Sequence, residues 1–184
     1  MEKNVVVKEI FSWMKAILLA VGLVFICRQF LFTPITVSGP SMMPTFEDQN
    51  KVIVSKISEI ERFDTIVFKS DLSESEYIIK RVIGLPGDTI EMKNDILYVN
   101  GKEYKEPYLQ EHKSNLNQGA TLTEDFTLSE KTGKSVVPEG SYFVLGDNRQ
   151  KSTDSRAFGF IEEDAVLGEV KLRFFPFDEI GFVK

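Results

Sequence analysis

The feature that most restricts the fold of this chain is an apolar segment near its start, IFSWMKAILLAVGLVFICRQFLF, at residues 10–32. Its uninterrupted apolar run, 16–27, would form a helix of only about 18 Å, which is shorter than the roughly 30 Å hydrocarbon layer of a bilayer. Lys15 and Arg28 can extend their charged ends to the lipid surface, and Trp13 suits an interfacial position. The full segment therefore predicts one membrane-spanning helix.

Two other interpretations of this segment remain open, a buried helix of a soluble protein and a cleavable signal peptide. A signal peptide also has a basic start and an apolar centre, but its cleavage site needs small residues after the apolar run. Here the sequence continues CRQFLFTPI, which has no such step, so an uncleaved signal anchor is favoured. By the positive-inside rule, the lysine-bearing tail, residues 1–9, is expected in the cytoplasm and the body, residues 33–184, on the other side.

Composition excludes several kinds of function. The net charge is −6, while the first 28 residues are net basic, so the body is strongly acidic and is a poor match for a nucleic-acid binder, which must neutralise phosphates. Cys27 and His112 are the only cysteine and histidine, which excludes an internal disulfide and a Cys/His zinc site. His112 lies in the polar stretch LQEHKSN and is expected in a solvated loop, where it would be a poor base for a Ser/His/Asp triad.

From residue 33 onward, short β-type runs alternate with turn residues. LPGD at 85–88 predicts a turn, and Asn100-Gly101 predicts a two-residue hairpin. Residues 103–140 are polar and weakly patterned, and we expect long loops or a small insertion there. Because helical periodicity is absent from this part of the sequence, we expect a mainly β body built as a coiled antiparallel sheet or barrel. The predicted strands are 51–56, 64–69, 77–84, 88–92, 95–99, 141–146 and 165–175.

The stretch SGPSMMPT, residues 38–45, holds Ser41 between glycine and proline residues. Proline fixes φ and glycine permits unusual dihedrals, so the Ser41 hydroxyl is predicted to have a defined place in a non-helical loop. A serine nucleophile also needs a base, and His112 is a poor candidate for it.

Lys80 can be that base if its ammonium loses a proton, which requires burial or a nearby cation to lower its pKa. In YIIKRVIG at 77–84, the alternation of a strand puts Lys80 on one face with Ile78 and Val82, an apolar setting for an amine. Arg81 lies on the other face, and one of the two faces is expected to meet solvent or a partner.

A third polar segment, LGDNRQKSTDSRAFG at 145–159, follows a predicted strand. It is either a solvated turn held by Asx-type hydrogen bonds, or a buried network that holds Ser152 beside another chain segment. The charged members that could pair in such a network are Asp147, Arg149, Asp154 and Arg156.

Together these segments resemble the bacterial type I signal peptidases, the membrane-anchored Ser/Lys proteases that remove signal peptides from exported proteins. The resemblance covers a signal anchor followed by SGPSMMPTF, FDTIVF, YIIKRVIGLPGD and GDNRQKSTDSRAFG, in the family's order and spacing. It implies the compact Gram-positive type, with a catalytic β domain of the signal-peptidase type. It also implies that Ser41 is the nucleophile, that Lys80 is the general base and that the Ser41 backbone N–H stabilises the oxyanion.

The resemblance assigns supporting roles as well. Ser152 would orient the lysine amine, and Gly39 stands where some relatives have a serine that helps to form the oxyanion hole. Met42 and Met43 would lie beside the substrate or on a membrane-facing surface, while a core position for them is equally open. Structural support is implied for Arg81, Asp147, Arg149, Asp154 and Arg156.

The function that the resemblance implies is cleavage of signal peptides after Ala-x-Ala-like sites by a monomeric, single-pass enzyme of the bacterial cell membrane. Its partners would be exported preproteins and the lipid bilayer, with no nucleic acid, metal or cofactor. Two alternatives are a self-cleaving repressor-type Ser/Lys protease, which would carry a DNA-binding domain in place of the anchor, and a non-catalytic membrane-tethered binding module. In the binding module, Ser41 and Lys80 would be incidental.

Overall fold

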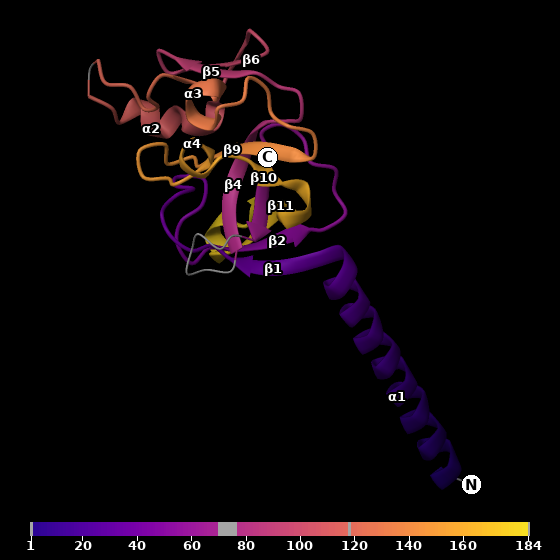
Figure 1. Cartoon of the computed structure of the whole chain (residues 1–184). Coiled ribbons are helices and arrows are strands. Elements are labelled where there is room, and N and C mark those ends of the chain that lie inside the picture. The colour runs from indigo at the N-terminus through magenta and orange to yellow at the C-terminus, as the bar shows by residue number, and fades with distance from the viewer. Residues whose placement is uncertain (1, 70–76, 118, 184) are drawn as a thin grey trace.

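A single long helix projects from a body of β-strands in the computed structural model, which describes residues 2–69, 77–117 and 119–183 (Figure 1). The helix α1 (Glu2–Ile26) continues as a short π-helical turn, η1 (Cys27–Leu31). The chain then enters β1 (Phe32–Thr36) directly. The expected architecture, a mainly β body behind one N-terminal helix, is confirmed.

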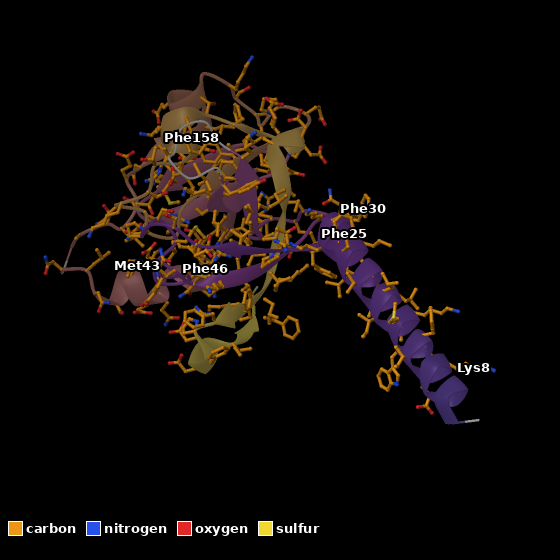
Figure 2. All side chains as sticks on the ribbon, turned by 90° about the horizontal axis from the view of Figure 1, so that it is seen from below. Lys8, Phe25, Phe30, Met43, Phe46 and Phe158 are labelled. Atoms are coloured by element: carbon orange, nitrogen blue, oxygen red, sulfur yellow. The ribbon has the colours of Figure 1, made fainter. Side chains whose placement is uncertain are left out.

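Residues 8–31 form a helical stretch that is long and apolar enough to cross a membrane. Its 24 residues correspond to about 36 Å of helix. None of this stretch is buried against the body. In Figure 2 the side chain of Lys8 projects from the free end of the helix, and Phe25, near the other end, is exposed. A helix that exposes apolar side chains on all sides is not the core helix of a soluble domain.

The larger sheet has eight strands, in the order β1-β2-β11-β3-β4-β9-β10, with β12 also paired to β11. Every pairing in it is antiparallel. All five strands that the sequence predicted in this part of the chain are present in this sheet, while β1, β10 and β12 were not predicted. The bounds are β2 (Lys51–Ser55), β3 (Thr65–Lys69), β4 (Tyr77–Gly84), β9 (Ser141–Leu145), β10 (Ile161–Glu162), β11 (Val166–Phe175) and β12 (Gly181–Phe182).

A smaller antiparallel sheet lies at the end of the body opposite α1 (Figure 1). Its strand order is β7-β6-β5-β8. Asn100 and Gly101 have φ angles of 53° and 74° and join β6 to β7, which is the backbone that the predicted two-residue hairpin requires. The predicted turn at 85–88 is closed by a hydrogen bond from the Asp88 N–H to the Leu85 carbonyl. The bounds are β5 (Ile90–Lys93), β6 (Ile96–Val99), β7 (Lys102–Tyr104) and β8 (Phe126–Thr127).

Residues 103–140 contain more regular structure than the sequence suggested. Beside β7 and β8, the described part holds η2 (Pro107–Leu109), α2 (Gln110–Ser114) and α3 (Leu128–Thr132). Helix α3 starts with a capping box, in which the Thr127 hydroxyl accepts from the Glu130 N–H and the Glu130 carboxylate accepts from the Thr127 N–H. The sequence TLSE carries this signature and could have revealed the helix. Short helices elsewhere are α4 (Ser155–Phe158), η3 (Glu163–Ala165) and η4 (Phe177–Glu179).

Apolar side chains under the 38–46 loop form one of three core clusters. Met42 is 1% exposed and Phe46 is fully buried, so Met42 takes the core position rather than a place on a membrane-facing surface. Met43, by contrast, is only partly buried. The large apolar side chains that the body does expose near its C-terminus are Phe175, Phe177, Ile180 and Phe182.

Candidate active site

Ser41 lies in a tight loop that follows β1. Gly39 has a φ of 82°, a conformation that favours glycine, and its N–H donates to the Asp48 carboxylate. A serine at this position would be strained in this backbone conformation. The buried side chains of Met42 and Phe46 fix the loop from below. Among the described residues, the Ser41 N–H has no hydrogen-bond acceptor.

Lys80 reaches Ser41 from the neighbouring part of the large sheet. On β4, its Nζ lies 2.7 Å from Ser41 Oγ and 3.0 Å from the Ile79 carbonyl oxygen. The residue is 3% exposed. Burial lowers the pKa of the Lys80 ammonium to about 8, although the carboxylates of Asp154 and Asp147 act in the opposite direction. A considerable share of this amine is therefore neutral near pH 8 and can accept a proton.

Arg81, the next residue of β4, is also buried, so neither face of the strand is open to solvent at this point. The face that the sequence left to solvent or a partner is covered by the same chain. The Arg81 guanidinium makes two hydrogen bonds to the Asp147 carboxylate, of 2.9 and 2.7 Å, and a third to the Phe63 carbonyl. The ring of Tyr108 lies 4.0 Å from the guanidinium carbon. Arg81 is thus the ion-pair partner of Asp147, a carboxylate that favours the charged form of Lys80.

Asp154 and Arg156 form the ion pair that the resemblance implies. Arg156 donates to both carboxylate oxygens of Asp154 at 2.8 Å, and Asp154 is fully buried. Asp154 also accepts from the Gly146 N–H at 3.0 Å, which ties the segment back to the end of β9. The segment is therefore a buried network, and the interpretation as a solvated turn is wrong.

The partners of the other charged residues in this network come from outside the motif. Asp147 pairs with Arg81, and the fully buried side chain of Arg149 pairs with Glu106. The Tyr108 hydroxyl donates to the same Glu106 carboxylate at 2.8 Å. Glu106 and Tyr108 were not predicted from the sequence, because they lie in a segment without recognisable periodicity and their partner is 41 or 43 residues away.

Ser152 is close to the pair, but the hydrogen bond expected from it to Lys80 is not formed. Its hydroxyl oxygen is buried and has no partner within the described part of the chain. It packs against Gly146, where an added Cβ would overlap the Ser152 hydroxyl and meet the Ser41 carbonyl oxygen. Ser152 and Ser41 therefore approach each other across this glycine, and the orienting role of Ser152 stays a prediction.

A cavity of about 250 Å³ opens beside the Ser41 and Lys80 side chains. Its apolar wall includes Val37, Met42 and Ile79, and its rim carries Lys151. No cluster of His, Cys, Asp and Glu side chains in the described ranges has the arrangement of a metal site. The cavity can hold a short apolar side chain next to a hydroxyl that is hydrogen-bonded to a buried amine.

Comparisons with known proteins identify the family of this chain. A family profile described as "Signal peptidase, peptidase S26" matches residues 10–175. Signal peptidase I of Bacillus caldolyticus is 52% identical over 167 residues, which cover 89% of this chain and 90% of the relative. Signal peptidase IB of Staphylococcus aureus (strain COL) is 43% identical over 183 residues, covering 94% and 93%.

A solved structure is similar as well. The crystal structure of a signal peptidase I from Enterococcus faecalis V583 has 47% sequence identity and a TM-score of 0.59, and the match covers 61% of this chain and 97% of that chain. The chain therefore belongs to the signal peptidase family, peptidase S26, and is a serine endopeptidase.

Proposed function

We propose that this chain is a membrane-bound enzyme that removes N-terminal signal peptides from exported preproteins, with Ser41 as nucleophile and Lys80 as general base. The observation that carries this proposal is the 2.7 Å distance between Lys80 Nζ and Ser41 Oγ in a buried setting. An exposed lysine with the ordinary pKa of about 10.4 would stay charged and could not accept a proton at neutral pH. The lowered pKa of Lys80, about 8, removes that obstacle.

The proposed reaction has two steps, acylation and deacylation. Lys80 takes the proton of the Ser41 hydroxyl while Ser41 Oγ bonds to the scissile carbonyl carbon, and the free Ser41 N–H donates to the developing oxyanion. Lys80 then gives the proton to the leaving amine as the C–N bond breaks. In the second step Lys80 takes a proton from a water molecule while the water oxygen bonds to the ester carbon. The bond between that carbon and Ser41 Oγ then breaks, Lys80 returns the proton to Ser41 Oγ, and the signal peptide leaves as a carboxylic acid.

The apolar lining of the cavity beside Ser41 is compatible with substrates that have small residues before the cut, of the Ala-x-Ala kind. Its volume is about 250 Å³, and Val37, Met42 and Ile79 give it an apolar wall. Pockets of this kind select by size and by a few polar groups. An alanine side chain fits in this space beside Ser41.

The short connection between anchor and nucleophile supports a membrane-bound substrate. Ser41 is nine residues after Phe32, so the extended chain spans at most about 30 Å. A preprotein held in the same bilayer by its own signal helix would present its cleavage site at a similar height. We therefore propose that the enzyme is a monomer of the cell membrane that needs no cofactor, with residues 1–9 in the cytoplasm and the body outside it.

Cleavage of a preprotein with an Ala-x-Ala site tests the pair of residues. With the full chain in detergent, we expect Ser41→Ala and Lys80→Ala each to reduce kcat/KM by on the order of 10³-fold or more. Ser135→Ala and Lys93→Ala are matched controls, because both side chains are exposed near the smaller sheet, and should cleave at the wild-type rate. Wild-type activity in either test variant would reject the pair, and a wild-type chain that cleaves no preprotein would favour the binding module.

A further inference from the structure

The 38–46 loop, which carries Ser41, accepts hydrogen bonds from other segments at four of its backbone carbonyls. Asn148 supplies two of them, from its side-chain amide to the Pro40 carbonyl at 3.1 Å and from its N–H to the Ser41 carbonyl at 3.0 Å. The third involves His112, whose Nε2 lies 2.7 Å from the Met43 carbonyl oxygen. The fourth comes from Arg173 on β11, whose Nη1 donates to the Thr45 carbonyl at 3.0 Å. Three segments therefore hold the loop, namely the one that follows β9, helix α2 and strand β11.

The chemistry of the His112 contact differs from that of a general base. A carbonyl oxygen only accepts, so Nε2 must carry the proton, and both the neutral Nε2–H tautomer and the imidazolium can donate it. The ring also contacts backbone two residues beyond Ser41 and makes no hydrogen bond to the Ser41 hydroxyl, which Lys80 occupies. His112 is therefore placed to hold the loop by donating a hydrogen bond, and it is not placed to accept a proton from Ser41.

Helix α2 is itself held against the body by buried contacts, so the His112 ring that bonds to the loop comes from a well-fixed element. Leu109, just before the helix, is fully buried, and the Lys113 ammonium donates to the Asp95 carbonyl at 2.8 Å. The preceding residues contact the network around the catalytic pair, since Glu106 binds Arg149 and Tyr108 stacks on Arg81. Movement of the small-sheet region relative to the Ser41 loop would break the His112 contact.

We propose that His112 is a positioning residue for the reaction, which holds the Ser41 loop against helix α2 and keeps Ser41 Oγ in line with Lys80. This proposal rests on the assignment of Ser41 as nucleophile. Displacement of a reacting group by about 1 Å can cost on the order of 10²-fold in rate. Loss of the contact therefore lowers kcat, while KM stays near its wild-type value because the cavity walls are unchanged.

Two substitutions separate positioning from simple packing. His112→Phe keeps a ring of similar size but removes the donor, whereas His112→Gln keeps an N–H donor that can reach the same carbonyl. In preprotein cleavage by the full chain in detergent, we expect His112→Phe to lower kcat roughly 10- to 100-fold and His112→Gln to recover most of it, with KM within about twofold in both. Glu111→Ala, an exposed neighbour on α2, should behave as wild type.

Two activity results would overturn the proposal, a wild-type kcat in His112→Phe, or a His112→Gln variant as impaired as His112→Phe. Hydrogen exchange gives a readout that does not depend on activity. The amides of Met43 and Phe46, which bond to carbonyls within the loop, should exchange faster in His112→Phe than in His112→Gln or the wild type. Unchanged exchange in His112→Phe would show that the His112 hydrogen bond does not hold the loop in place. Failure of the Ser41 assignment is recognised separately, because Ser41→Ala would then still cleave.

Discussion

The proposed role of Lys80 as general base depends on the balance between burial and charge. Removal from water disfavours the ammonium, whereas Asp154 and Asp147 favour it. Each carboxylate is held by a bidentate arginine, Asp147 by Arg81 and Asp154 by Arg156. Burial has the largest effect of the three, so the pKa of Lys80 falls.

The pH dependence of cleavage follows from this balance. The proposed mechanism needs neutral Lys80, and the neutral fraction of a base rises as pH increases through its pKa, here about 8. We expect kcat/KM to increase about tenfold per pH unit well below pH 8 and to level off above it. A pH series of preprotein cleavage between about pH 6 and 9 measures this, with Lys93→Ala as a control that should keep the same profile. A flat profile would contradict Lys80 as the base.

At the scale of elements, the site depends on how closely the end of β9 approaches the Ser41 loop. Gly146 follows directly after β9 and leaves room for the Ser152 hydroxyl and the Ser41 carbonyl. Its N–H is also bound by Asp154. A side chain at this position would push the two catalytic segments apart.

Gly146→Ala is therefore expected to lower kcat at least about 100-fold, because the added methyl group displaces backbone next to the proposed nucleophile. Overpacking is also expected to lower the free energy of unfolding by roughly 1–3 kcal/mol. Cleavage kinetics and a denaturation curve followed by circular dichroism give the two values. Gly181→Ala is the matched control, since an added Cβ there meets nothing closer than 4.0 Å. Full activity of Gly146→Ala would mean that the approach is not required.

Elements differ in how well local sequence predicted them. The alternation in 77–84 and the Asn100-Gly101 pair were sufficient for β4 and the β6–β7 hairpin, because both depend on neighbouring residues. Strand β1 was missed because Phe32 continues the apolar segment and Pro34 discourages a strand assignment. Helix α2 is too short to show a period, so its histidine was expected in a solvated loop, whereas His112 is in fact partly buried against Met43.

At the scale of the whole molecule, the exposed apolar helix and the acidic body belong to different environments. The helix leaves the body at the end opposite the smaller sheet (Figure 1). The helix and the short link to Ser41 together require the active site to work close to a membrane surface, if the helix spans it. Orientation across that membrane is the property of the whole chain that most needs a measurement.

Cysteine labelling in intact cells can test the proposed orientation. In a Cys27→Ser background, Ser135→Cys marks the body and Glu9→Cys marks the N-terminal tail. The positive-inside rule predicts that a membrane-impermeant maleimide labels position 135 in intact cells and position 9 only after the cells are opened. The reverse pattern would contradict an extracytoplasmic catalytic body. Both variants should be labelled equally in detergent, which controls for thiol reactivity.

The amino-acid sequence by itself determined the membrane helix, most strands and the motifs that resemble a Ser/Lys protease, because these depend on hydrophobicity, periodicity and residues near one another in the chain. Only the tertiary structure decided that Lys80 Nζ lies within hydrogen-bond distance of Ser41 Oγ, that Arg149 pairs with Glu106, and that Met42 belongs to the core. These contacts join segments about 40 residues apart or more, or depend on which side of a loop meets the sheet. Their energies arise from desolvation and close packing, which exist only once the sheet has brought the segments together.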